Sequence, residues 1–263
     1  MQRSIEMVPK KYPSFGKCIF CGATENLTTE HIVPEGLTGK GEMVIENGSC
    51  RRCNNYANEA YEQPALKADF LPVRHMLQLR RKRRGRKTSP RKMPPVSLTA
   101  VAPGPDVVLD QELPPENYPP LCEFICHEPA GLLLGVDRSG DKRTFRALYV
   151  HLGLPGTRPQ SALTRHTHVM GAPEKVAAKM AYCWAVAEKG LGAFDTTDLL
   201  DLLCGRRDDV FNFVGSPVEP ERLAKLHLHK FYFRKRGDFV TVLVHLFASF
   251  DGPLYEIVKG RER

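Results

Sequence analysis

CIFCGATENLTTEHIVPEGLTGKGEMVIENGSCRRCNNYANEAYE, residues 18–62, contains two close pairs of cysteines. Cys18 and Cys21 form the first CxxC pair, and Cys50 and Cys53 form the second, with 28 residues between the pairs. A CxxC turn points two sulfur atoms at one position, so two such turns can make a closed tetrahedral Zn²⁺ site. The alternative, four unrelated buried cysteines, is disfavoured by this spacing. The pattern therefore predicts a structural zinc ion held by all four cysteines.

The residues between and after the two pairs predict two short strands and a helix. Residues 27–29 and 32–33 are strand-like and predict the first strand. Residues 43–45 predict the second strand. Residues 54–62 read as a helix, and Pro64 either ends this helix or starts the next one. The predicted unit is strand, turn, strand and helix, with zinc holding its two ends together.

A cluster of polar side chains is expected where this helix packs on the hairpin. Asn54 and Asn58 are four residues apart, so they lie on one face of the helix. If that face covers the hairpin, it meets Glu30 and His31. Carboxylate and amide oxygens suit Mg²⁺ or Mn²⁺, and a neighbouring imidazole can take a proton from water.

The combined pattern CxxC…TxEHIxP…CxxCN resembles the zinc-stapled ββα-metal type of HNH endonuclease, over roughly a quarter of the chain. The resemblance implies that Glu30 is a ligand of a catalytic divalent metal, Mg²⁺ or Mn²⁺, and that His31 is the general base. It also implies that Asn54 and Asn58 complete the site. Two departures are that Glu30 stands where Asp is commoner and that Asn58 stands where His is common. The competing interpretation is a structural His31 in a plain zinc ribbon.

Positive charge is concentrated in the first third of the chain. Residues 1–95 hold 18 Lys and Arg against 9 Asp and Glu, whereas residues 96–263 hold 20 against 21, giving the net charge of +8. Such an excess indicates a polyanionic partner, because a basic run binds phosphate backbones without reading sequence. A solvated linker and a nuclear import signal are the alternatives. The predicted phosphate contacts are Arg80, Arg81, Lys82, Arg83, Arg84, Arg86 and Lys87.

The rest of the chain predicts a larger α+β region with antiparallel strands and two helices. Its near-neutral charge argues against a second phosphate-binding surface. Cys122, Cys126 and His127 look only faintly like a second metal site and fit apolar strand positions better. The elements expected in this region are strands at 132–134 and 145–149, helices at 174–192 and 195–204, and a hairpin over 226–247.

These patterns divide the chain into a nuclease module at 1–72, a basic and proline-rich linker at 73–95, and an α+β region at 96–263. We expect that last region to be regulatory or to bind a partner or substrate. The predicted function is a metal-dependent DNA endonuclease of low sequence preference, of the kind found among cytoplasmic phage-defence effectors. The alternatives are a non-catalytic zinc module that binds nucleic acid, and an RNase. A membrane span is not expected, because no run of about 18 uncharged apolar residues occurs.

Overall fold

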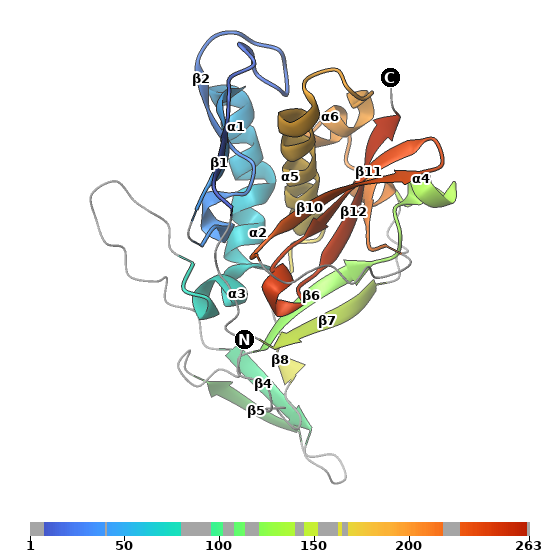
Figure 1. The fold of residues 1–263 in the computed structure, drawn as a ribbon. Coiled ribbons are helices and arrows are strands. Elements are labelled where there is room, and N and C mark those ends of the chain that lie inside the picture. Colours follow the sequence, from blue (N-terminus) through green and yellow to red (C-terminus); the bar gives the residue numbers. More distant parts are fainter. Residues whose placement is uncertain are drawn as a thin grey trace, which may run out of the picture.

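The computed structural model combines helices with mostly antiparallel sheets (Figure 1). It describes residues 8–39, 41–79, 96–101, 108–113, 121–139, 145–151, 163–164, 168–217 and 227–261. The N-terminal strands and helix are followed by a larger α+β region, so the predicted fold class is confirmed. None of the helices in the described ranges is both long and apolar enough to cross a membrane.

The N-terminal sheet has three strands in the order β1-β3-β2. β2 (Leu27–His31) and β3 (Met43–Cys50) form the predicted antiparallel hairpin, and both strands are longer than the sequence suggested. Residues 32–33 form a bend after β2 rather than a continuation of the strand. β1 (Lys10–Tyr12), which was not predicted, pairs with β3 in parallel.

A chain of short helices follows this hairpin directly. Cys50 ends β3 and is also the N-cap of α1 (Arg51–Ala57). The helix then continues as η2 (Asn58–Glu62) and α2 (Gln63–Lys67), and after a turn the chain forms α3 (Leu71–Met76). The predicted strand–strand–helix order is therefore present, with a helix longer than expected.

η2 is a turn of π-helix inside an otherwise α-helical run. The N–H of Gln63 donates to the carbonyl of Asn58, five residues earlier. Pro64 lies in the first turn of α2, where the helical run continues, so the predicted alternative in which Pro64 ends the helix was wrong. Single π turns are often found at functional sites, because they change which side chains a helix presents on one face.

The C-terminal part contains a four-stranded antiparallel sheet covered by helices. The two predicted helices are α5 (Ala172–Lys189) and α6 (Thr197–Leu203), and a further turn, α7 (Val210–Phe213), follows them. The sheet, in the order β10-β11-β12-β9, consists of β9 (Val214–Gly215), β10 (Lys230–Arg236), β11 (Phe239–His245) and β12 (Leu254–Arg261). The predicted hairpin is β10 and β11, joined at Gly237 with a φ of +56°.

The middle of the chain supplies two smaller sheets. They are formed by β4 (Val96–Val101), β5 (Val108–Leu113) and β8 (Leu163–Thr164), and by β6 (Leu121–His127) and β7 (Phe145–His151). The strand predicted at 132–134 was wrong, since these residues lie in the helical turn α4 (Gly131–Leu134). Gly135 ends that turn with a φ of +66°, and the leucine run lacks the alternation that a strand requires.

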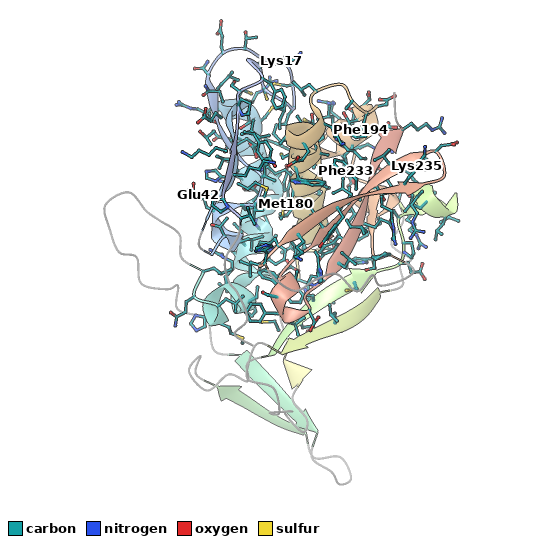
Figure 2. All side chains as sticks on the ribbon, viewed as in Figure 1. Lys17, Glu42, Met180, Phe194, Phe233 and Lys235 are labelled. Atoms are coloured by element: carbon teal, nitrogen blue, oxygen red, sulfur yellow. The ribbon has the colours of Figure 1, made fainter. Side chains whose placement is uncertain are left out.

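Helix α5 lies between the N-terminal helices and the C-terminal sheet (Figures 1 and 2). On one side the Tyr182 hydroxyl donates to the carbonyl of Ile19, and the Tyr182 ring lies 5.5 Å from the ring of Phe20. On the other side Trp184 packs on Phe233, with ring centroids 4.5 Å apart. The buried side chains of both halves therefore form one continuous core. The proposed linker at 73–95 falls mostly outside the described residues, and its boundaries stay a prediction.

Candidate active site and zinc centre

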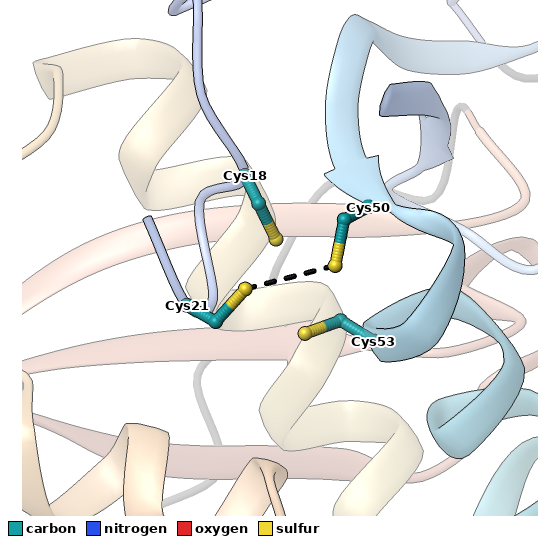
Figure 3. A group of neighbouring side chains, drawn as sticks. All are labelled: Cys18, Cys21, Cys50 and Cys53. Atoms are coloured by element: carbon teal, nitrogen blue, oxygen red, sulfur yellow. Dashed lines mark hydrogen bonds between the residues drawn. The ribbon is translucent and has the colours of Figure 1, made fainter. Parts of the chain in front are cut away.

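Four cysteine thiols converge beside the start of α1 (Figure 3). The sulfur atoms of Cys18, Cys21, Cys50 and Cys53 all lie within 4.8 Å of one another, and those of Cys21 and Cys50 are 3.6 Å apart. A tetrahedral zinc ion with sulfur ligands at about 2.3 Å spaces those ligands about 3.8 Å apart. The donor set and its spacing therefore fit the structural Zn²⁺ ion that the two CxxC pairs predict.

Backbone hydrogen bonds shape the first cysteine pair. The N–H of Cys18 donates to the carbonyl of Ala23 at 2.7 Å, and the N–H of Gly22 donates back to the carbonyl of Cys18 at 2.9 Å. Gly22 has a φ of +77°, which a residue with a side chain adopts only with strain. The N–H of Ile19 donates to the carbonyl of Gly48 and so joins the turn to β3.

The surroundings of Cys21 favour its thiolate, the form that binds metals. Burial opposes ionisation, but hydrogen bonds from the Ala23 backbone and the neighbouring thiols outweigh it and lower the pKa of Cys21 to about 7. The guanidinium group of Arg52, in the first turn of α1, lies beside the same thiol. Burial raises the pKa of the Cys18 and Cys53 thiols, so of these three cysteines Cys21 is the one whose thiolate its surroundings favour.

His31 ends β2 with 28% of its side chain exposed. Its Nε2 lies 3.8 Å from Oε1 of Glu35, which stands in the short 3₁₀ turn that follows. Its Nδ1 is buried and has no hydrogen-bond partner among the described residues. A partly exposed imidazole at a fixed strand end can accept a proton from a bound water molecule, which is the role that the family resemblance implies.

Glu30 points to the opposite face of β2, because successive strand residues alternate. Its side chain is 1% exposed and forms an ion pair with Lys179 of α5. The Lys179 ammonium also lies 2.6 Å from Oε1 of Glu62 and donates to the carbonyl of His31 at 3.2 Å. The structure therefore joins two carboxylates and a backbone carbonyl around one buried lysine.

The two predicted helix ligands have other partners in this structure. The Asn54 amide donates to the hydroxyl of Ser49 at 3.5 Å, and the amide oxygen of Asn58 accepts from Gln63 at 3.1 Å. Glu62, four residues beyond Asn58, is the residue of this helical run that pairs with the same lysine as Glu30. The roles of Asn54 and Asn58 as metal ligands stay a prediction.

The oxygen donors of Glu30, Asn54 and Asn58 are of the type that a Mg²⁺ or Mn²⁺ ion prefers, so the residues present fit such an ion chemically. Glu30 is available to it only when the ion pair with Lys179 opens. Among the described residues, the four cysteines are the one group of three or more His, Cys, Asp or Glu side chains that converges on a point.

Sequence reasoning missed Glu62 and Lys179. Glu62 stood at the end of the predicted helix but carries no family motif. Lys179 is three residues after Val176 and four before Cys183, so it falls on the apolar stripe of its helix and is only 4% exposed. A lysine on such a stripe is a signal of a buried ion pair, because an unpaired buried ammonium is costly.

The predicted phosphate-binding run, residues 80–87, lies outside the described residues. Arg74, which lies in the predicted basic linker at 73–95, makes hydrogen bonds to the backbone of the N-terminal part. Its guanidinium donates to the carbonyl of Gly36 at 2.7 Å and to that of Leu66 at 2.5 Å. Cys122 and Cys126 are buried on β6, as expected for apolar strand positions.

A known protein family matches the segment that contains the four-cysteine cluster. Residues 18–70 match the model of the HNH endonuclease family, and this segment includes all four cysteines, β2, β3 and α1. No curated protein and no solved structure matches the chain. The match therefore covers the N-terminal segment, and the larger C-terminal region has no counterpart in these comparisons. Residues 18–70, called the HNH module below, match the HNH endonuclease family and contain a cysteine cluster suited to structural zinc.

Proposed function

We propose that the chain is a metal-dependent endonuclease that hydrolyses DNA phosphodiester bonds with low sequence preference. The observation that carries this proposal is His31, a partly exposed imidazole at the end of β2 in a segment that matches HNH endonucleases. His31 takes a proton from the attacking water molecule. Glu30, Asn54 and Asn58 would hold a Mg²⁺ or Mn²⁺ ion, which would supply positive charge to offset the negative charge that develops on the phosphate.

The charge distribution supports a nucleic acid as the substrate. The basic run at residues 80–87 is proposed to contact the phosphate backbone, which gives affinity without sequence preference. The proposed setting is phage defence in the cytoplasm. Residues 96–263 are proposed to contact a protein regulator, since an unspecific nuclease requires control.

Relaxation of supercoiled plasmid tests the proposal. The zinc-loaded wild-type protein is compared with His31→Ala in the presence of Mg²⁺ or Mn²⁺, at about 50 mM salt so that phosphate contacts are not screened. His75→Ala, a histidine of α3 outside the proposed site, is the matched control. We expect nicking by the wild type and by His75→Ala, and loss of nicking in His31→Ala and without the divalent ion.

The same gels separate the alternatives. Equal cutting by wild type and His31→Ala would refute the assignment of the general base. A plasmid that is retarded but stays supercoiled would favour a non-catalytic zinc module that binds nucleic acid. Cleavage of RNA under the same conditions, with the plasmid intact, would make the protein an RNase.

A further inference from the structure

Lys179 is held by three oxygen atoms that come from the HNH module. They are a carboxylate oxygen of Glu30, a carboxylate oxygen of Glu62 and the carbonyl oxygen of His31. Glu30 and His31 are adjacent residues of β2, and Glu62 belongs to the π turn η2. Two carboxylates and a backbone carbonyl are also a set of ligands that hard divalent cations use in proteins.

The charges around this lysine do not balance. Glu30 and Glu62 bring two negative charges, and Lys179 supplies one positive charge. A divalent ion would match the two carboxylates, whereas the lysine leaves one negative charge in excess.

The ion pair between Lys179 and Glu30 is almost fully buried. The side chain of Lys179 is 5% exposed, and that of Glu30 is 1% exposed. The two partners therefore interact away from bulk water, where an ion pair is screened little and where each carboxylate needs a cation.

We propose that Glu30, Glu62 and the His31 carbonyl form a cation site in which Lys179 and a divalent metal ion are alternative occupants. This inference rests on the proposed function, since Glu30 is the residue that the catalytic ion is proposed to use. It adds Glu62 as a ligand and Lys179 as the competitor that sets the metal affinity. Because Lys179 belongs to α5, metal loading of the module depends on a residue outside the matched segment.

Metal binding without nucleic acid tests the inference. The zinc-loaded protein is titrated with Mn²⁺, and free Mn²⁺ is measured by electron paramagnetic resonance. Lys179→Met keeps an unbranched side chain of similar length and removes the charge. Lys175→Met, one turn earlier on α5 and partly exposed, is the matched control. We expect Lys179→Met to bind Mn²⁺ roughly tenfold more tightly or better, a difference of about 1.4 kcal/mol, and Lys175→Met to behave as the wild type.

An affinity that is unchanged or weaker in Lys179→Met would overturn the inference. If Lys179→Met does not fold alone, it is refolded with Mn²⁺. Recovery of a cooperative thermal transition then supports the site, and its absence overturns it. Glu62→Gln, which keeps the pair between Lys179 and Glu30, should weaken Mn²⁺ binding, and equal binding would refute Glu62 as a ligand.

The outcome is independent of cleavage. Plasmid nicking that depends on His31, together with Mn²⁺ affinity that is indifferent to Lys179, would leave the proposed function standing and refute this inference alone. If Lys179→Met binds Mn²⁺ more tightly but the wild-type protein does not nick the plasmid, the cation site stands and the proposed function is refuted.

Discussion

His229 gives the stability of this protein a calculable dependence on pH. The imidazole is buried between the two halves of the molecule, where its Nε2 lies 2.9 Å from the carbonyl oxygen of Leu37. Its Nδ1 accepts the N–H of Phe247 at 3.2 Å. Nε2 must therefore carry the proton and Nδ1 must not, so the folded state holds the neutral ring. Burial, reinforced by nearby His245, lowers the pKa of His229 to about 4.

The sign and size of the effect follow from this shift. Below about pH 6.5 the unfolded chain protonates this histidine while the folded chain does not, so stability falls as the pH falls toward 4. Each pH unit in that window costs about 1.4 kcal/mol. Between about pH 7.5 and about pH 5.0 the loss from His229 alone is about 2 kcal/mol.

The assay is urea unfolding followed by the fluorescence of Trp184, the single tryptophan of the chain, which packs against Phe233. His229→Leu removes the titration and leaves the Leu37 carbonyl and Phe247 N–H unpaired. It should therefore be less stable than wild type at about pH 7.5, and the stability difference should shrink by about 2 kcal/mol at about pH 5.0. Comparing the two proteins at each pH cancels effects of acid on the zinc site. A difference that stays constant across this range would refute the assignment of a neutral buried ring.

Three further predictions concern the zinc site, a buried lysine and the basic run. Cys53→Ser should lower zinc content below the one ion per chain expected for the wild type, measured by metal analysis, and should lower the melting temperature because the clamp on α1 is lost. Lys259→Met should melt roughly 4 °C or more above wild type near pH 7, because the Lys259 ammonium is buried without a hydrogen-bond partner among the described residues and burial lowers its pKa to about 7. Stability of the wild type should rise as the pH rises from about 7 toward about 10.5, and calorimetry that shows no gap between the two proteins would contradict this. Glutamine at all seven basic positions of residues 80–87 should weaken plasmid binding and flatten its salt dependence in a filter-binding assay, and an unchanged slope would remove this run from the interface.

The four-cysteine cluster and the hairpin were predictable because their determinants are local. Two CxxC pairs fix which four sulfur atoms converge, whatever the rest of the chain does. The β-rich residues on both sides of the turn fix β2 and β3, and the chain enters α1 at Cys50. The helices α5 and α6 were likewise signalled by their own apolar stripe and end residues.

Two kinds of feature were not predictable in the same way: contacts between distant residues, and local structures that hydrophobic periodicity does not distinguish. Lys179 lies 117 residues from Glu62, and the local sequence around either residue does not indicate that the two form an ion pair. The π turn at residues 58–62 shifts the hydrogen bonding by one residue, and hydrophobic periodicity does not register so small a change. The leucines at 132–134 were misread because a short apolar run fits a strand or a helical turn equally well.

Three side chains from the C-terminal region donate hydrogen bonds to backbone carbonyls of the HNH module. Lys179 donates to His31, Tyr182 to Ile19 and His229 to Leu37. A buried carbonyl left without a donor costs about 1–3 kcal/mol, so each of these bonds fixes the position of the segment that it meets. Those segments are the end of the strand with the proposed base, the zinc turn and the loop after the strand. The C-terminal region therefore holds three segments of the proposed site in place, and we expect a regulator that loosens α5 to disturb both the ion pair of Glu30 and the placement of His31.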